Sequence, residues 1–112
     1  MELLTFVETA TFSRRLAALG LEGALLGLQL ELLANPEAGD LEPGTGGLRK
    51  VRVPSPRRGK GKRGGARVHY LWLPNKGRIY LVFVYAKSEA AALTPEQKRQ
   101  LQNVVTAIKR TG

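Results

Sequence analysis

Four side chains alternate along two neighbouring strand-like segments and could act on a phosphodiester. They are Lys50 and Arg52 on one segment, and Arg67 and His69 on the next. Every second residue of a strand shares a face, so pairing of the two segments would gather all four. Arginine and lysine stabilise charge that develops on a phosphorane. A lysine crowded by other cations has a lowered pKa and can act as a base.

Tyr85 and Lys87 end the following strand-like segment and would join this cluster in one of the two possible registers. Cleavage of RNA without a metal needs a base for the 2′-hydroxyl, stabilisation of the phosphorane and a proton for the 5′-oxygen. His69 could serve as acid or base, or could simply pack. The same cations could also hold phosphates without cutting, and the residues alone favour binding over catalysis.

The chain has a formal net charge of +9, and all of the excess lies between Arg49 and Arg67, which hold nine basic residues and no acid. Such a segment suits a polyanion, most often nucleic acid, although a basic loop can also be merely solvated. The further cations predicted to bind RNA or the ribosome are Arg49, Arg57, Arg58, Lys60, Lys62 and Arg63.

Other chemistries are disfavoured by composition. There is no cysteine, one histidine, and only scattered carboxylates, so we expect no disulfide, metal site or cofactor. The GTGG stretch at 44–47 has no lysine–serine partner and no helix after it. It is therefore predicted to be a structural turn and not a phosphate loop.

The pattern predicts one α+β domain over residues 1–112. The predicted elements are a strand at 3–7, a helix from Thr9 or Thr11 to Leu19, a helix at 22–34, a loop at 36–47, strands at 48–53, 66–73 and 78–86 around a turn at 74–77, and a helix capped by Thr94. We expect the strands to form an antiparallel sheet, with 78–86 central and covered on both faces.

Apolar positions indicate which faces are buried. The residues expected to pack on the helices are Val51, Val53, Val68, Tyr70 and Trp72. Those expected to form the inner faces of the last two helices are Leu25, Leu26, Leu28, Leu30, Leu32 and Leu33, and Leu101, Val104, Val105 and Ile108.

Residues 16–34 are apolar enough to suggest a membrane span, but they contain Glu22, Gln29 and Glu31. A central charge costs about 2.5–3.5 kcal/mol on insertion, so two short helices of a soluble protein are expected. The start of the chain has no basic region and does not read as a secretory signal. We expect a cytoplasmic protein without membrane contact.

The stretch ANPEAGDLEPGTGGLRKVRVPSPRRGKGKRGGARVHYLW, followed by IYLVFVYAKSEAAALTPEQKRQL, resembles the RelE/HigB family of type II toxin–antitoxin toxins, in its HigB-like branch. The likeness runs from about Phe6 to Leu101, and GTGGLRK, GKGKRGGAR and VYAKSE carry it. It implies an RNase-like α+β fold and a ribosome-dependent, metal-independent mRNA interferase. It also implies a HigA/RelB-like antitoxin as partner. The toxin would then bind operator DNA only through this antitoxin.

The resemblance assigns family positions to Lys50, Arg52, Arg67 and Lys87. Ser88 stands where RelE itself has an arginine, and the AAALT segment lacks the family's C-terminal tyrosine, so Tyr85 or His69 could substitute. Two alternatives remain open. One is a non-catalytic RNA- or ribosome-binding module, or decayed toxin. The other, a DNA-binding regulatory subunit, lacks a clear helix-turn-helix in residues 11–34.

Overall fold

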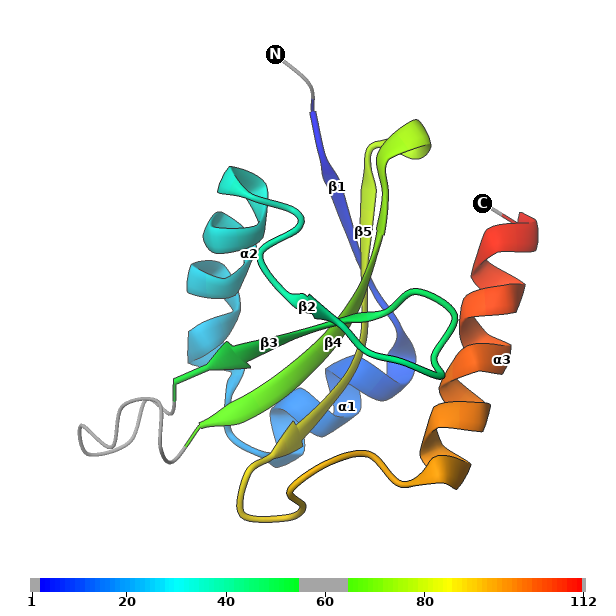
Figure 1. The fold of residues 1–112 in the computed structure, drawn as a ribbon. Helices are drawn as coiled ribbons and strands as arrows, with labels where there is room; N and C mark the ends of the chain where they lie inside the picture. The colour runs from blue at the N-terminus through cyan, green and yellow to red at the C-terminus, as the bar shows by residue number, and fades with distance from the viewer. Residues whose placement is uncertain (1–2, 55–64, 112) are drawn as a thin grey trace.

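The computed structural model describes residues 3–54 and 65–111 as a five-stranded mixed sheet with helices on both faces (Figure 1). The elements are β1 (Thr5–Glu8), α1 (Ala10–Ala18), a 3-10 turn (Glu22–Ala24), α2 (Leu25–Ala34), β2 (Asp40–Leu41), β3 (Arg49–Val53), β4 (Ala66–Leu73), a 3-10 turn (Pro74–Lys76), β5 (Arg78–Ala86) and α3 (Pro95–Thr111). The predicted α+β class is confirmed.

The strands are ordered β1-β5-β4-β3-β2. The expected antiparallel pairs β3–β4 and β4–β5 are present, with β5 in the interior of the sheet. Two details differ from expectation. β1 pairs with β5 in parallel, so the sheet is mixed, and the expected loop at 36–47 contains β2, which pairs with β3. Both are edge strands, whose pairing depends on tertiary packing more than on local pattern.

The register of β4 and β5 shifts between His69 and Tyr70. His69 pairs with Phe83 and Tyr70 pairs with Leu81, which leaves Val82 as an extra residue on β5. This is a β-bulge, which lets two successive side chains contribute to one face. Val82 and Phe83 accordingly both belong to the core beneath α3.

The sheet separates two hydrophobic clusters. α1 and α2 cover one face, where Phe12, Leu16, Leu28 and Leu32 pack on the strands, and α3 covers part of the other face (Figure 1). The predicted inward residues Val51, Val53, Val68 and Tyr70 are buried against α1 and α2, while Trp72 is half-buried. The face under α3 buries Leu48, Leu71, Val82, Leu101 and Val105.

The broad apolar face predicted for α2 is wrong in part. Leu28 and Leu32 are buried, but Leu26, Leu30 and Leu33 are 66%, 57% and 50% exposed. Six of the ten residues of α2 are leucine and they lie on all sides of the helix, so the leucine pattern alone does not define the inner face. In α3, Leu101 and Val105 are buried as predicted and Ile108 is half-buried, whereas Val104 is 38% exposed.

No single helix in residues 3–54 and 65–111 is long and apolar enough to cross a membrane. Only Ala10–Ala18 and Glu22–Ala34 taken together have that length and composition, and they are bent by 114°.

Two glycines differ in whether the neighbouring backbone leaves room for a side chain. A Cβ on Gly65 would lie 2.1 Å from the carbonyl oxygen of Val53, whereas one on Gly27 would have no neighbour within 4 Å. We expect Gly65→Ala to lower the free energy of unfolding by about 2–3 kcal/mol, because the strand backbone must move. Gly27→Ala, inside α2, should raise it by about 0.5–1 kcal/mol. Urea unfolding measures both, and equal effects would contradict the described strand contact.

Candidate functional site

Three side chains form a row across the inner strands on the face that carries α3. Arg52 on β3 pairs with Arg67 on β4, and Arg67 pairs with Tyr85 on β5. Directly paired residues project to the same side, with Cβ atoms about 4.5–5.5 Å apart. The prediction that Arg52 and Arg67 share a face is confirmed, and the register adds Tyr85 to them. We call these three residues the arginine row.

Arg52 and Arg67 stand directly opposite each other on neighbouring strands. Within residues 3–54 and 65–111, neither Arg52 nor Arg67 forms a salt bridge. Among the described residues, the side chain of Arg67 makes one long hydrogen bond, 3.5 Å from Nη1 to the carbonyl oxygen of Ala66. Like charges directly opposite each other destabilise a sheet. Two guanidinium groups in this arrangement are suited to bind an anion such as a phosphate.

A second row lies beside the first, and a loop carboxylate partly neutralises it. Lys50 pairs with His69, and His69 pairs with Phe83. Glu42 Oε1 lies 3.3 Å from His69 Nε2 and 3.6 Å from Lys50 Nζ. Glu42 Oε2 lies 3.4 Å from the Nζ of Lys98 on α3. Glu42 therefore connects its loop, the sheet and α3.

The GTGG turn at 44–47 fixes the position of Glu42. Its three glycines have φ values of 82°, 81° and 122°, which favour glycine. The buried Thr45 donates its hydroxyl to the Glu42 carbonyl at 2.7 Å and accepts the Leu48 N–H at 3.2 Å. The N–H of Glu42 donates to the Leu48 carbonyl at 2.8 Å. The prediction of a structural turn is confirmed, and the turn holds both backbone groups of Glu42.

The side chain of His69 is packed in the interior of the protein. Its side chain has no exposed surface, and its ring lies 6.0 Å from that of Tyr85. Burial lowers the pKa of His69; the bond to Glu42 opposes this shift, and the charges of Lys50 and Lys98 add to it. His69 is therefore neutral at pH 7, and its Nδ1 has no hydrogen-bond partner in the described part of the chain.

The surroundings of Glu42 favour its ionised form, and those of Tyr85 favour its neutral form. Burial alone would raise the pKa of Glu42, but the hydrogen bonds to His69 and Lys98 and the charge of Lys50 outweigh burial and lower it. Burial raises the pKa of Tyr85, and the nearby Arg67 offsets this only in part. The Tyr85 hydroxyl is buried without a partner in the described residues. At neutral pH it is a phenol that can donate a hydrogen bond, and not a phenolate base.

These shifts predict a loss of stability in mild acid. The pKa of His69 is lower in the folded chain than its ordinary 6.5, so the unfolded chain binds more protons as the pH falls through that value. The stabilisation is complete above pH 6.5 and declines below it. Glu42 adds a further decline below its ordinary 4.5. We expect a lower urea midpoint at pH 5.5 than at pH 7.5, and a smaller difference in His69→Gln. An unchanged difference in that variant would contradict the assignment.

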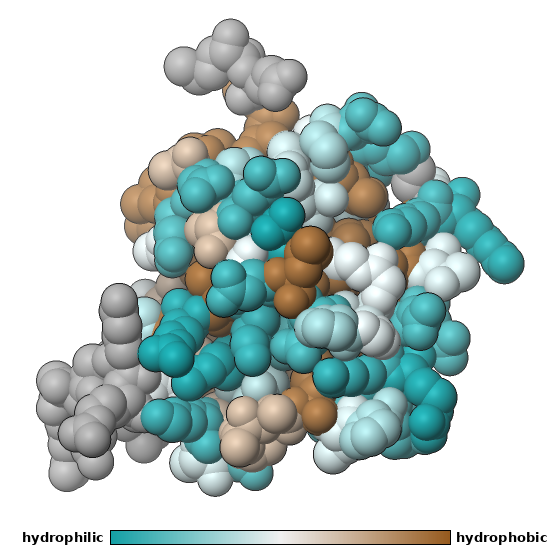
Figure 2. Space-filling model, in the orientation of Figure 1, coloured by the Kyte–Doolittle hydropathy of each residue, from teal (hydrophilic) through white to brown (hydrophobic). Residues whose placement is uncertain are grey.

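The other predicted residues lie outside the two rows or outside the described residues. Arg49 lies on the opposite face, where its Nη1 donates to the Gly39 carbonyl at 2.8 Å and its Nη2 lies 3.8 Å from Glu37. Lys87 follows β5 with an exposed side chain, and its N–H donates to the Gly65 carbonyl at 3.0 Å. Arg57, Arg58, Lys60, Lys62 and Arg63 lie outside the described residues. Figure 2 shows hydrophilic side chains gathered below and to the left of the centre of this face of the molecule.

Sequence reasoning missed Glu42 and Lys98. Glu42 is the last acid before an acid-free stretch from 43 to 88 and is separated from the GTGG turn by Pro43 alone, so a hairpin would have folded it onto Lys50. Lys98 stands in line with Leu101 and Val105 at helical spacing, which directs it toward the sheet.

No group of three or more histidine, aspartate or glutamate side chains is placed to hold a metal ion within 3–54 and 65–111. No protein-family model matches the chain.

Proposed function

We propose that the protein is the toxin of a type II toxin–antitoxin module, a ribosome-dependent mRNA interferase of RelE/HigB type that needs no metal. The observation that carries the proposal is the arginine row. Two arginines are paired across strands, neither has a carboxylate partner in the described residues, and one of them is paired with a tyrosine whose hydroxyl is buried. A phosphodiester placed on this row would be held by charge-assisted hydrogen bonds where its negative charge increases during cleavage.

The proposed reaction is attack of the RNA 2′-oxygen on the neighbouring phosphorus, with breakage of the bond to the 5′-oxygen. Arg52 and Arg67 would stabilise the phosphorane, and Lys50 or Lys87 would transfer protons. Lys50 lies in the row beside Arg52 and Arg67, 3.6 Å from Glu42, and would deliver a proton to the leaving oxygen. Lys87 then remains as the candidate base, with Tyr85 as a hydrogen-bond donor.

The partners proposed with this activity are the ribosome, which would present the mRNA, and a HigA/RelB-like antitoxin. Operator DNA would be bound only through that antitoxin. The acid-free segment from 43 to 88 supports contact with ribosomal RNA, and such binding weakens steeply as salt rises.

A second candidate function is RNA or ribosome binding without cleavage. It is favoured by the burial of His69, by the ion pair that holds Lys50, and by Ser88 after Lys87. The arginine row would then hold a phosphate without cutting it.

Incubation of the purified protein with an mRNA, with and without translating ribosomes, separates the two functions. We expect new 5′ ends by primer extension only when ribosomes are present. Binding to ribosomes without new ends would support the second function. New ends on free RNA would contradict dependence on the ribosome.

A further inference from the structure

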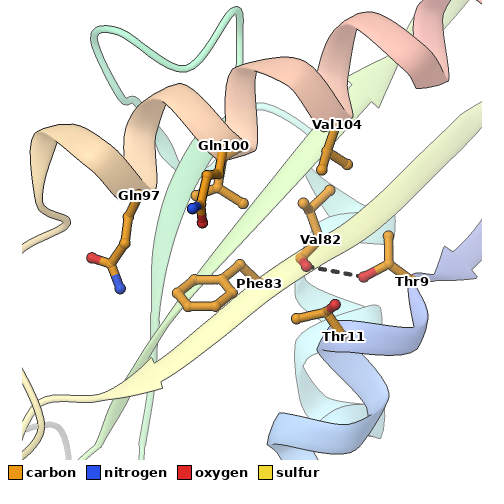
Figure 3. A pocket seen from close by; sticks show the side chains of 8 residues that line it. Thr9, Thr11, Val82, Phe83, Gln97, Gln100 and Val104 are labelled. Carbon is orange, nitrogen blue, oxygen red and sulfur yellow. Dashed lines mark hydrogen bonds between the residues drawn. The ribbon is translucent and has the colours of Figure 1, made fainter.

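An open groove runs between α3 and the start of α1, with β5 as its floor (Figure 3). It has a volume of about 220 Å³. Val82 and Phe83 form the floor, Gln97, Gln100 and Val104 line the side on α3, and Thr9 and Thr11 line the other (Figure 3). The bulge in β5 brings both Val82 and Phe83 to this side of the sheet. None of the proposed catalytic roles uses this groove.

The two glutamines leave the NH₂ group of one and the carbonyl oxygen of the other free. Gln97 accepts the N–H of Thr94 at 2.9 Å through Oε1, so its NH₂ group remains without a partner in the described residues. Gln100 donates its NH₂ to Glu96 at 3.3 Å, so its Oε1 remains. Thr9 is already used, because it donates to the Val82 carbonyl at 2.9 Å. The free groups therefore stand above an apolar floor that includes the Phe83 ring, over which the Arg15 guanidinium carbon lies 5.1 Å from the ring centroid.

The groove continues toward the arginine row. A second hollow of about 190 Å³ shares Phe83 and Gln97 with the groove and extends past the ion pair of Arg15 and Glu89 to Tyr85. Tyr85 is paired with Arg67, and the rings of Phe83 and Tyr85 lie 6.3 Å apart. Together the two hollows exceed about 300 Å³, the lower end of ordinary small-molecule sites. A chain whose phosphate lies on Arg67 could thus place a neighbouring group in the groove.

We propose that this groove binds a nucleobase of the RNA whose phosphate lies on the arginine row. The inference rests on the proposed function. Unpaired bases are recognised by stacking on aromatic side chains and by hydrogen bonds to their edges. A base edge presents a donor beside an acceptor, which the free groups of Gln100 and Gln97 complement. Val104, which sequence reasoning placed in the core, provides an exposed apolar wall for the ring.

The test uses nucleoside monophosphates and ribose 5-phosphate, with the full chain observed by NMR. We expect the monophosphates to shift the side-chain amide signals of Gln97 and Gln100 and the ring signals of Phe83, while ribose 5-phosphate does not. Gln100→Ala should weaken nucleotide binding about threefold to tenfold, as for the loss of one hydrogen bond. Gln102→Ala, on the same helix but outside the groove, should leave it unchanged.

Three results would overturn the base site. Ribose 5-phosphate could shift the same signals equally, which would indicate a phosphate site. Gln100→Ala and Gln102→Ala could behave alike. The nucleotides could produce no shift, as expected if the groove receives a side chain of a protein partner. The ribosome assay tests the endonuclease activity independently of the base site. Cleavage by the wild type without nucleotide binding would reject only the base site. Nucleotide binding without cleavage would reject only the endonuclease.

Discussion

Replacement of Arg67 by alanine should reduce ribosome-dependent cleavage at least about 100-fold while leaving the fold intact. A preorganised donor to the charge of a transition state contributes about 10²–10³ in rate. Arg67 lies at the centre of the arginine row, between Arg52 and Tyr85. The same change removes an unfavourable pairing of like charges, so we expect the melting temperature to stay equal or rise. Loss of activity without loss of stability would identify a functional residue.

Arg99→Ala is the matched control for Arg67→Ala. Arg99 lies on α3, its side chain is 67% exposed, and it pairs with Glu96, so its removal changes the net charge equally but away from the row. We expect cleavage within about twofold of the wild type, since exposed ion pairs contribute little. Arg67→Lys should retain part of the activity, because it keeps the charge but loses the planar fork. Full cleavage by a folded Arg67→Ala variant would rule out the proposed role of Arg67. An equal loss of cleavage in Arg99→Ala would show that the effect comes from the net charge of the protein and not from the position of Arg67.

Glu42→Ala should cause the largest loss of stability, about 2–4 kcal/mol in the free energy of unfolding. Breaking a buried ion pair by removing one partner costs about 3–5 kcal/mol, and here Lys50 and Lys98 retain some contact with water. The Glu42 side chain is only 12% exposed and serves three partners, including His69. Urea unfolding at pH 7.5 measures the loss, and Glu42→Gln should lose less, because it can still bond to His69.

Glu37→Ala provides the comparison for Glu42→Ala. The Glu37 side chain is 67% exposed and lies 3.8 Å from Arg49, so its removal should cost no more than about 1 kcal/mol. If the two alanine variants were equally stable, Glu42 would not be the centre of the cluster.

The strands that form the arginine row could be predicted because their pattern is local. β4 and β5 have the predicted bounds, and the short turn between them made them antiparallel neighbours. The alternation of Lys50 with Val51 and of Arg67 with Val68 then assigned one face to the core and the other to the cations. The face of Tyr85 depended on the register, which the bulge at His69–Tyr70 complicates.

The remainder of the site could not be predicted because tertiary packing assembles it. Glu42 comes from a hairpin whose first strand has two residues, and Lys98 comes from a helix more than fifty positions later. Neither position has a local pattern that identifies its partner. The rotation of α2 was equally undetermined, because leucines occupy both its buried and its exposed sides.

The parallel pairing of β1 with β5 has a consequence for synthesis on the ribosome. Thr5 meets its partner Arg78 only after most of the chain has been made, and Tyr85 follows later still. Contacts so distant in sequence form slowly, since a long loop must close first. The apolar sides of α1 and α2 emerge first, without the strands that cover them. The nascent chain therefore cannot complete the arginine row until β5 has been made, and truncation before Arg78 removes the strand with which both β1 and β4 pair.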